Sequence, residues 1–117
     1  MKPVGKPWGF EIIWAHTDKY VARVLHIDAG KRLSLQIHKQ KEETILVISG
    51  ELELEIQEDQ KPKFKHLSPG DFFHIAAGVT HRLKALTEVE VVEVSSELGD
   101  VLRIVDDYGR ATICGAW

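Results

Sequence analysis

Short segments in which apolar and polar residues alternate, separated by turn residues, run through most of this chain. A two-residue period is the pattern of a strand that buries one of its faces. Glycine or proline marks the breaks, as at Gly50 and at Pro69-Gly70. The pattern predicts strands at residues 10–14, 20–27, 32–38, 44–49, 51–57, 71–75, 81–86 and 89–95. No long segment has a competing helical period.

Many short strands joined by glycine and proline turns predict a sandwich or barrel, because closure or double layering protects the sheet edges. We therefore expect an all-β fold, a single jelly-roll barrel over residues 1–117. Residues 101–107 are either a further strand or an irregular tail. Residues 58–65 are rich in charge and contain Pro62, which predicts an exposed loop.

Composition narrows the classes of function. A chain of 117 residues can bury a core without disulfides or a metal, and its only cysteine, Cys114, excludes an intramolecular disulfide. The net charge of -3 gives no electrostatic reason to expect nucleic acid. No apolar run approaches the ~20 residues that cross a bilayer, and no signal peptide is evident. We expect a cytoplasmic protein that binds neither nucleic acid nor membrane.

Four polar residues are spaced as the ligands of a metal ion would be on a β-barrel. They lie in the two glycine-bounded segments Gly30-x5-Gln36-x-His38-x4-Glu43-x6-Gly50 and Gly70-x7-Gly78-x2-His81. On one strand, Gln36 and His38 face the same side with Cα atoms roughly 6–7 Å apart. Two imidazoles, a carboxylate and an amide suit one divalent ion, and Zn, Mn, Co, Ni and Fe all remain open.

The predicted strand at residues 32–38 has two unlike faces. Its polar face consists of Arg32, Ser34, Gln36 and His38, and its apolar face of Leu33, Leu35 and Ile37. Because the polar face mixes an amide, an imidazole and a hydroxyl, we expect it to bind a ligand; a plain surface strand is the alternative. The apolar face needs cover from a second sheet or a second copy, and we predict a homodimer.

Both glycine-bounded motifs resemble those of the cupin superfamily. The first cupin motif carries His-x-His, and Gln36 stands where its first histidine usually is. The second motif matches at Gly70, Gly78 and His81, whereas alanine replaces its proline and its asparagine at positions 76 and 85. The resemblance implies a jelly-roll fold with a metal site.

A closer resemblance appears when the flanking residues are included. The segments Lys6-Pro7-Trp8-Gly9, 32–38, 75–83 and Asp106-Asp107-Tyr108-Gly109-Arg110 occur in order. This series is similar to the mannose-6-phosphate isomerase domain of the type II family, in which glutamine typically replaces the first histidine. That domain commonly forms the C-terminal part of a bifunctional enzyme with mannose-1-phosphate guanylyltransferase. The resemblance does not extend to the nucleotidyltransferase half, so it implies no nucleotide-sugar synthesis.

The resemblance implies a metal-dependent aldose-ketose isomerase acting on a sugar phosphate, with mannose 6-phosphate and fructose 6-phosphate as the pair. A divalent metal stabilises the charge that develops on the sugar oxygens. Arg32 is the leading candidate for phosphate binding and catalysis, and His74 is a candidate proton carrier. Further substrate-binding candidates are Lys6, Ser34, Arg82 and Arg110. A surface salt bridge is the alternative for each cation, and a packed or solvated histidine is the alternative for His74.

Two other functions compete with the isomerase. A non-catalytic, metal-binding cupin that binds a sugar or sugar phosphate is the first alternative, because fold does not determine function. An iron-dependent dioxygenase is the second, and iron-dependent oxygen uptake would identify it. Conversion of mannose 6-phosphate would separate the isomerase from both.

Overall fold

Two antiparallel six-stranded sheets form the protein in this computed structural model, which describes residues 2–96, 101–110 and 113–114. The first sheet contains, in spatial order, β1 (Val4–Lys6), β2 (Gly9–His16), β3 (Tyr20–Ile27), β10 (Val89–Ser96), β5 (Glu43–Ser49) and β8 (Phe72–Ile75). The second contains β12 (Ile113–Cys114), β11 (Val101–Val105), β4 (Leu35–Ile37), β9 (His81–Ala85), β6 (Leu52–Glu58) and β7 (Lys61–Leu67).

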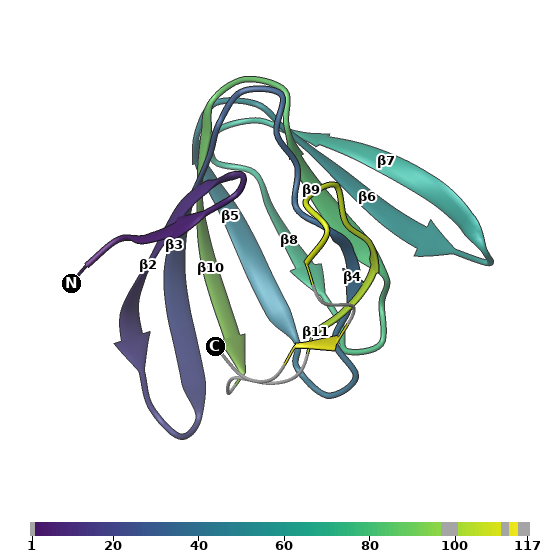
Figure 1. Cartoon of the computed structure of the whole chain (residues 1–117), viewed down its shortest axis with the longest axis horizontal. Helices are drawn as coiled ribbons and strands as arrows, with labels where there is room; N and C mark the ends of the chain where they lie inside the picture. Colours follow the sequence, from purple (N-terminus) through teal and green to yellow (C-terminus); the bar gives the residue numbers. More distant parts are fainter. Residues whose placement is uncertain (1, 97–100, 111–112, 115–117) are drawn as a thin grey trace.

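The two sheets lie face to face, and the chain passes repeatedly from one to the other (Figure 1). Alternate residues of each strand meet between them, as the two-residue period requires. Leu25 and Ile45 from the first sheet and Leu54 and Leu83 from the second are almost fully buried in this core. The described residues form strands and turns without a helix, which confirms the predicted all-β jelly roll.

Gly50 connects β5 to β6 and lets the chain change sheets in a sharp turn. Its φ of +81° lies in the left-handed region, and a Cβ there would sit 2.1 Å from the carbonyl oxygen of Glu88. Only glycine avoids both the strain and the clash. The tight reversal predicted at this position is confirmed.

Residues 61–67 form a strand, so the prediction of an exposed loop at residues 58–65 was wrong. β7 pairs with β6 from Leu52–Leu67 to Glu58–Lys61. Pro62 is tolerated because β7 is the edge strand of its sheet. The strand lacks an alternating pattern because six of its seven residues are exposed, and Leu67 is the one that is buried.

The strand predicted at residues 32–38 is shorter and irregular. Gln36 pairs with His81, whereas Arg32 forms an isolated bridge with Lys84, so four steps along one segment match three along the other. Leu33 and Ser34 are consequently both buried. A slip of one residue reverses the face of every side chain beyond it. Arg32 therefore does not share the face of Gln36, as the regular alternation had predicted.

Strands at the chain ends differ from the expectation in smaller ways. Residues 101–105 form β11, the first of the two alternatives considered for this region. β1 and β12 were not predicted, because two or three residues are too few to show a period. The described part of the chain contains no helix long and apolar enough to span a membrane.

Candidate metal centre

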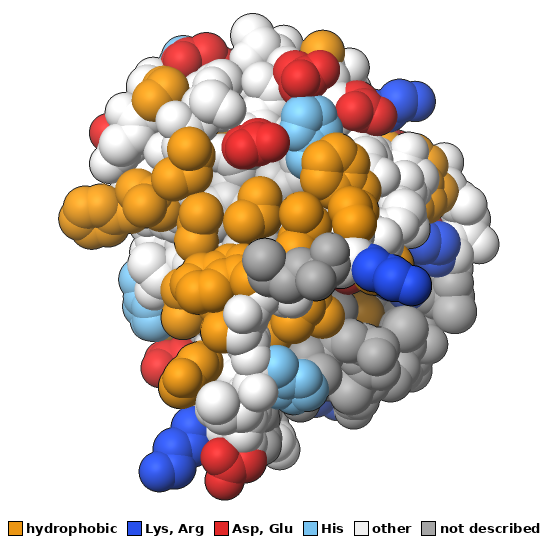
Figure 2. Space-filling view, turned by 90° about the vertical axis from the view of Figure 1, so that its left-hand side faces the viewer, with side chains coloured by type: hydrophobic (Ala, Val, Ile, Leu, Met, Phe, Trp, Pro, Cys, Tyr) orange, Lys and Arg blue, Asp and Glu red, His pale blue; other side chains and the backbone are white. Residues whose placement is uncertain are grey.

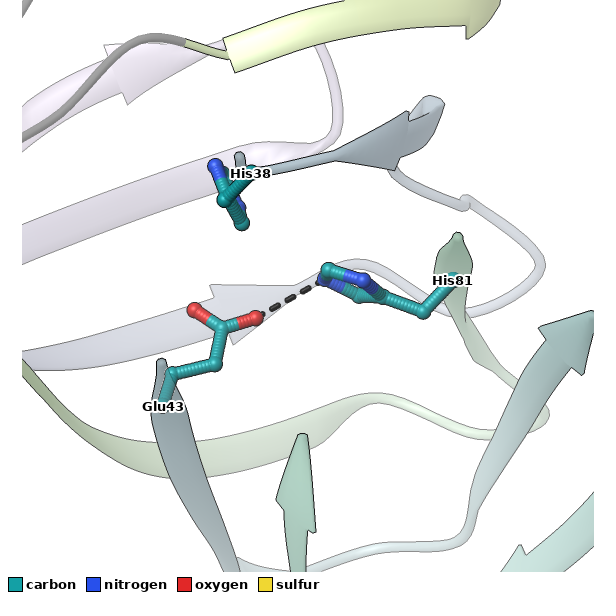
Figure 3. Close-up of side chains that lie close together, drawn as sticks. All are labelled: His38, Glu43 and His81. Atoms are coloured by element: carbon teal, nitrogen blue, oxygen red, sulfur yellow. Dashed lines mark ion pairs between the residues drawn. The ribbon is translucent and has the colours of Figure 1, made fainter. Parts of the chain in front are cut away.

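His38, Glu43 and His81 point toward one another between the two sheets (Figure 3). Each offers a ligand atom, and these atoms lie within 4.8 Å of one another. All three residues are buried. The imidazole Nε2 of His81 lies 2.8 Å from Oε1 of Glu43, and the two imidazole rings are 5.5 Å apart. Three of the four predicted metal ligands thus form one cluster.

Strand ends and one backbone bond hold this cluster together. Glu43 begins β5 in the first sheet and His81 begins β9 in the second, so their side chains meet across the interior. The amide of Gly78 donates to the carbonyl of His38 at 2.8 Å, which ties the two glycine-bounded motifs to each other. The carbonyl of Val79 lies 2.9 Å from Nδ1 of His81. A proton on Nδ1 leaves the Nε2 lone pair directed at the cluster.

Charge in the cluster is arranged as a metal ion requires. Burial alone would raise the pKa of Glu43. The neighbouring His81, Lys41 and His38 lower this pKa by more than burial raises it, so the carboxyl is held ionised. Burial lowers the pKa of His81, whereas its contact with Glu43 raises it, with a net rise. Oε2 of Glu43 is buried and finds no hydrogen-bond donor among the described residues. An orphaned carboxylate oxygen beside two imidazoles fits a divalent ion.

Gln36, the fourth predicted ligand, lies directly across from His81 on the neighbouring strand. Opposite residues of an antiparallel pair face the same side, so its amide is directed inward with the cluster. Gln36 and His38 line the same cavity, and the hydroxyl of Ser34 lies 3.5 Å from the amide oxygen of Gln36.

A cavity of about 60 Å³ opens beside the cluster between the two sheets. Its lining is rich in cations and consists of Lys6, Trp8, Glu11, Arg23, Leu33, Ser34, Gln36, His38, Val101, Arg103 and Arg110. Four of these residues are lysine or arginine and one is glutamate, so cations outnumber carboxylates in the lining itself. The volume is below the roughly 300–1,000 Å³ of typical small-molecule pockets, and a whole hexose phosphate would have to displace part of the lining.

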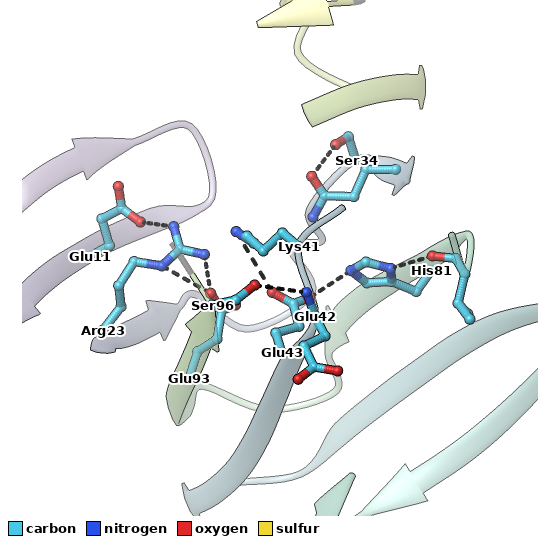
Figure 4. Close-up of polar contacts among 11 residues, drawn as sticks. Glu11, Arg23, Ser34, Lys41, Glu42, Glu43, His81, Glu93 and Ser96 are labelled. Carbon is cyan, nitrogen blue, oxygen red and sulfur yellow. Dashed lines mark hydrogen bonds and ion pairs between the residues drawn. The ribbon is translucent and has the colours of Figure 1, made fainter. Parts of the chain in front are cut away.

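A buried network of charged side chains includes part of the cavity lining (Figure 4). Arg23 donates to Glu11 at 2.7 Å and to Glu93 through both Nε and Nη2. Lys6 is paired with Glu11 at 3.3 Å, and Lys41 lies 3.9 Å from Glu43. Burial raises the pKa of Glu93 and lowers that of Lys41. These ionisable groups extend from the cavity wall to the metal cluster.

Sequence reasoning missed this network, although it left a signal. Arg23 occupies the same strand face as Val21 and Leu25, and Glu93 the same face as Val91, all of which are buried. An ionisable residue at an apolar position of a strand marks either a paired charge or a site. Arg103 was missed for another reason: its place beside Gln36 depends on the pairing of β11 with β4.

The substrate-binding residues predicted from sequence separate into two groups. Lys6, Ser34 and Arg110 line the cavity. Arg32 and Arg82 instead lie together with Glu55 on the outer face of the second sheet.

The candidate proton carrier His74 also lies away from the cluster. It is half-exposed on β8, where its Nδ1 contacts the hydroxyl of Thr44 at 3.0 Å and its Nε2 lies 3.6 Å from Glu42. Thr44 follows Glu43, whose side chain lies in the cluster, and successive residues of a strand face opposite sides. His74 therefore belongs to the outer face of the first sheet.

Comparison with known proteins agrees with the fold and the motifs. Residues 23–95 match the model of the cupin domain family, Cupin_2. This is more than half of the chain, and the protein belongs to the cupin family.

Relatives with longer chains carry the resemblance further. The chain is 31% identical over 116 residues to a mannose-1-phosphate guanylyltransferase of Escherichia coli K12, and 32% identical over 115 residues to the xanthan biosynthesis protein XanB of Xanthomonas campestris. Each match covers 93% of this chain but only 23% and 24% of the relatives, so the chain spans about a quarter of their length. These matches confirm the resemblance that the motifs predicted.

Solved structures with the same fold include enzymes. An RmlC-like cupin from Shewanella frigidimarina superimposes with a TM-score of 0.74 at 18% identity, covering 81% of this chain and 82% of that one. KdgF from Halomonas superimposes with a TM-score of 0.71 at 24% identity, covering 82% of this chain and 87% of that one. Oxalate decarboxylase from Bacillus subtilis superimposes with a TM-score of 0.73 at 16% identity, covering 82% of this chain and 27% of that one. At these identities the likeness establishes the fold.

Proposed function

We propose that this protein is a metal-dependent sugar-phosphate isomerase that interconverts mannose 6-phosphate and fructose 6-phosphate. The observation that carries the proposal is a buried cluster of two histidines and a glutamate that adjoins a cation-lined cavity. A metal and an anionic substrate would thus lie side by side. The similarity to mannose-1-phosphate guanylyltransferases supports mannose phosphates as the substrate class.

The residues of the site divide into two roles in this proposal. Gln36, His38, Glu43 and His81 would hold one divalent ion, and that ion would supply Lewis-acid stabilisation of the charge on the sugar oxygens. Lys6 and Arg110, which line the cavity, would bind the phosphate together with the newly found Arg103. Arginine suits this role because its planar guanidinium donates two bonds to a phosphate at once. Nitrogen and oxygen ligands without thiolate fit Zn, Mn, Co, Ni or Fe.

A non-catalytic cupin that binds metal and a sugar phosphate is the second candidate. Two observations favour it: the cavity is small, and neither Arg32 nor His74 lies in its lining. Without a group that moves the proton between C1 and C2, the same site would bind a sugar phosphate and leave it unchanged.

Turnover separates the two candidates. We expect protein loaded with Mn, Co or Zn to convert mannose 6-phosphate into fructose 6-phosphate, as followed by NMR. The variant His81→Ala, loaded in the same way, should show no conversion. Absence of fructose 6-phosphate with every metal, despite confirmed loading of the native protein, would leave the binding protein as the better description.

The outer face of the first sheet supports the prediction of a homodimer. Its exposed hydrophobic side chains gather on the side of the molecule that carries this sheet (Figure 2). One apolar row crosses five strands, from β2 to β8: Ile12, Val24, Val92, Leu46 and Phe72. Five strands cover about 20–25 Å, so two such faces would bury roughly 1,000 Å² in total, the lower range of specific interfaces. We propose that a second copy covers this face.

A further inference from the structure

The last residue of β11 and the segment that follows it, residues 105–110, are bound along the second sheet and are called here the C-terminal strap. Its yellow trace turns back beside β4 and β9 (Figure 1). The guanidinium of Arg82 donates to the carbonyl of Val105 at 2.9 Å. The hydroxyl of Tyr108 donates to the carbonyl of Arg32 at 2.9 Å. Two residues of the second sheet's outer face thus hold the strap by its backbone and its tyrosine.

A two-bonded ion pair fixes the middle of the strap. Arg32 donates from Nε to Oδ2 of Asp107 at 2.6 Å and from Nη2 to Oδ1 at 2.9 Å. This parallel geometry fixes orientation as well as distance. Both side chains are more than one third exposed, and exposed pairs contribute little to global stability. The consequence of this pair is therefore the placement of the strap.

The end of the strap brings a cation to the cavity. Asp106 accepts from the amide of Arg110 at 2.7 Å and from its Nε and Nη2 at 3.1 and 3.0 Å. The guanidinium of Arg110 also lies 5.4 Å from the centre of the Tyr108 ring. Arg110 lines the cavity beside the metal cluster. Its position therefore depends on where the strap is held.

We propose that Arg32 is a positioning residue that, by clamping Asp107, holds Arg110 at the cavity and so makes the site select phosphorylated over neutral sugars. The proposal rests on the proposed function only in taking the cavity as the substrate site. Arg32 itself lies on the outer face of the sheet and does not line the cavity. Its effect on a phosphate must pass through the strap.

A double-mutant cycle tests this route with metal-loaded protein and two probes, mannose 6-phosphate and mannose, titrated by calorimetry. Loss of one charge-assisted contact should weaken binding of mannose 6-phosphate roughly 10-fold in Arg32→Ala, in Asp107→Asn and in Arg110→Ala. The double variant Arg32→Ala/Arg110→Ala should be no weaker than Arg110→Ala, because both changes remove the same contact. Affinity for mannose should stay unchanged in every variant, which a general loss of structure would not allow.

Lys84→Ala is the matched control, because Lys84 also lies on the outer face beside Arg32. This substitution removes one positive charge, as Arg32→Ala does. Its affinity for mannose 6-phosphate should equal that of the native protein. Losses that multiply in the double variant, an unaffected Arg32→Ala, or an equal loss in Lys84→Ala would each overturn the clamp. Native protein that binds mannose 6-phosphate no better than mannose would overturn the clamp and the isomerase together, whereas selective binding without turnover would overturn the isomerase alone.

Discussion

At the scale of single residues, burial turns His38, Glu43 and His81 from ordinary polar groups into a candidate metal centre. A carboxylate and two imidazoles on the surface would be solvated, but here one glutamate oxygen has no hydrogen-bond donor among the described residues. Leaving a buried polar group unpaired costs roughly 1–3 kcal/mol, and a charged group costs more. A bound cation would remove that cost, so we expect metal and fold to be compatible.

We predict that His38→Ala and His81→Ala each lower metal affinity by more than about 100-fold, which exceeds the effect of typical outer-shell changes. Competition with a chelating dye measures this loss. His66→Ala should bind metal like the native protein, because His66 is exposed and contacts Glu51 on the second sheet. Full metal occupancy in both His38→Ala and His81→Ala would show that these two histidines are not the ligands.

Arg23 should matter for stability more than any exposed cation. It lies buried between Glu11 and Glu93, so Arg23→Ala would remove the guanidinium from both carboxylates and leave Glu11 with its contact to Lys6. Breaking a buried pair in this way costs about 3–5 kcal/mol. Urea unfolding should show this loss, and Glu93→Gln in the same chain should recover part of it. A loss below 1 kcal/mol for Arg23→Ala would mean that water reaches the network.

The sequence predicted that these polar residues lie together because glycine-bounded spacing controls which residues reach the strand ends, and their role as metal ligands stays a prediction. Gln36, His38, Glu43 and His81 were all found in this way, and the structure brings three of them into a single cluster beside the fourth. The face of Arg32 could not be predicted, since one extra residue between positions 32 and 36 shifts the register. Such an irregularity arises from pairing with β9 and leaves no local pattern.

At the scale of elements, the β6–β7 hairpin shows how pairing can create a strand without periodicity. Its seven cross-strand partners supply the hydrogen bonds, and β7 needs to bury only Leu67. Charged residues and proline indicated a loop because they are typical of exposed segments. An edge strand such as β7 is exposed in the same way as a loop. β5 and β10, which bury one face each, were predicted nearly to their ends for the opposite reason.

The turn of this hairpin offers a stabilising substitution. Asp59 and Gln60 have φ values of 51° and 63°, in the left-handed region. This region disfavours residues other than glycine, asparagine and aspartate. Gln60→Gly should therefore raise the free energy of unfolding by about 1 kcal/mol. Glycine at Lys63, which lies within the strand, should instead destabilise the protein. Equal effects at the two positions, or a loss of stability in Gln60→Gly, measured by urea unfolding, would contradict the turn geometry.

At the scale of the whole molecule, the core and the candidate metal site occupy different parts of the same interior. The apolar cluster that includes Leu25, Ile45, Leu54 and Leu83 joins the sheets without any metal ligand. Removal of metal by a chelator should therefore leave the β-sheet circular dichroism unchanged. Loss of the sheet signal on chelation would show that the metal is part of the folding energy.

The apolar outer face makes a prediction about assembly. Leu46→Lys would place a charge within the row that crosses five strands, so it should convert a dimer into a monomer. Light scattering at micromolar concentration would give the mass of each. Phe64→Lys is the control, because Phe64 is also an exposed hydrophobic residue but belongs to the second sheet. A native protein with the mass of a monomer would remove the proposed interface.

Anomalous diffraction from crystals grown with Mn or Co would locate the metal directly. We expect one strong peak between the side chains of His38, Glu43 and His81, within about 2.0–2.3 Å of their ligand atoms, and its absence in crystals of His81→Ala. A peak elsewhere, or none at this cluster with metal in excess, would contradict the metal centre and the isomerase proposal that depends on it.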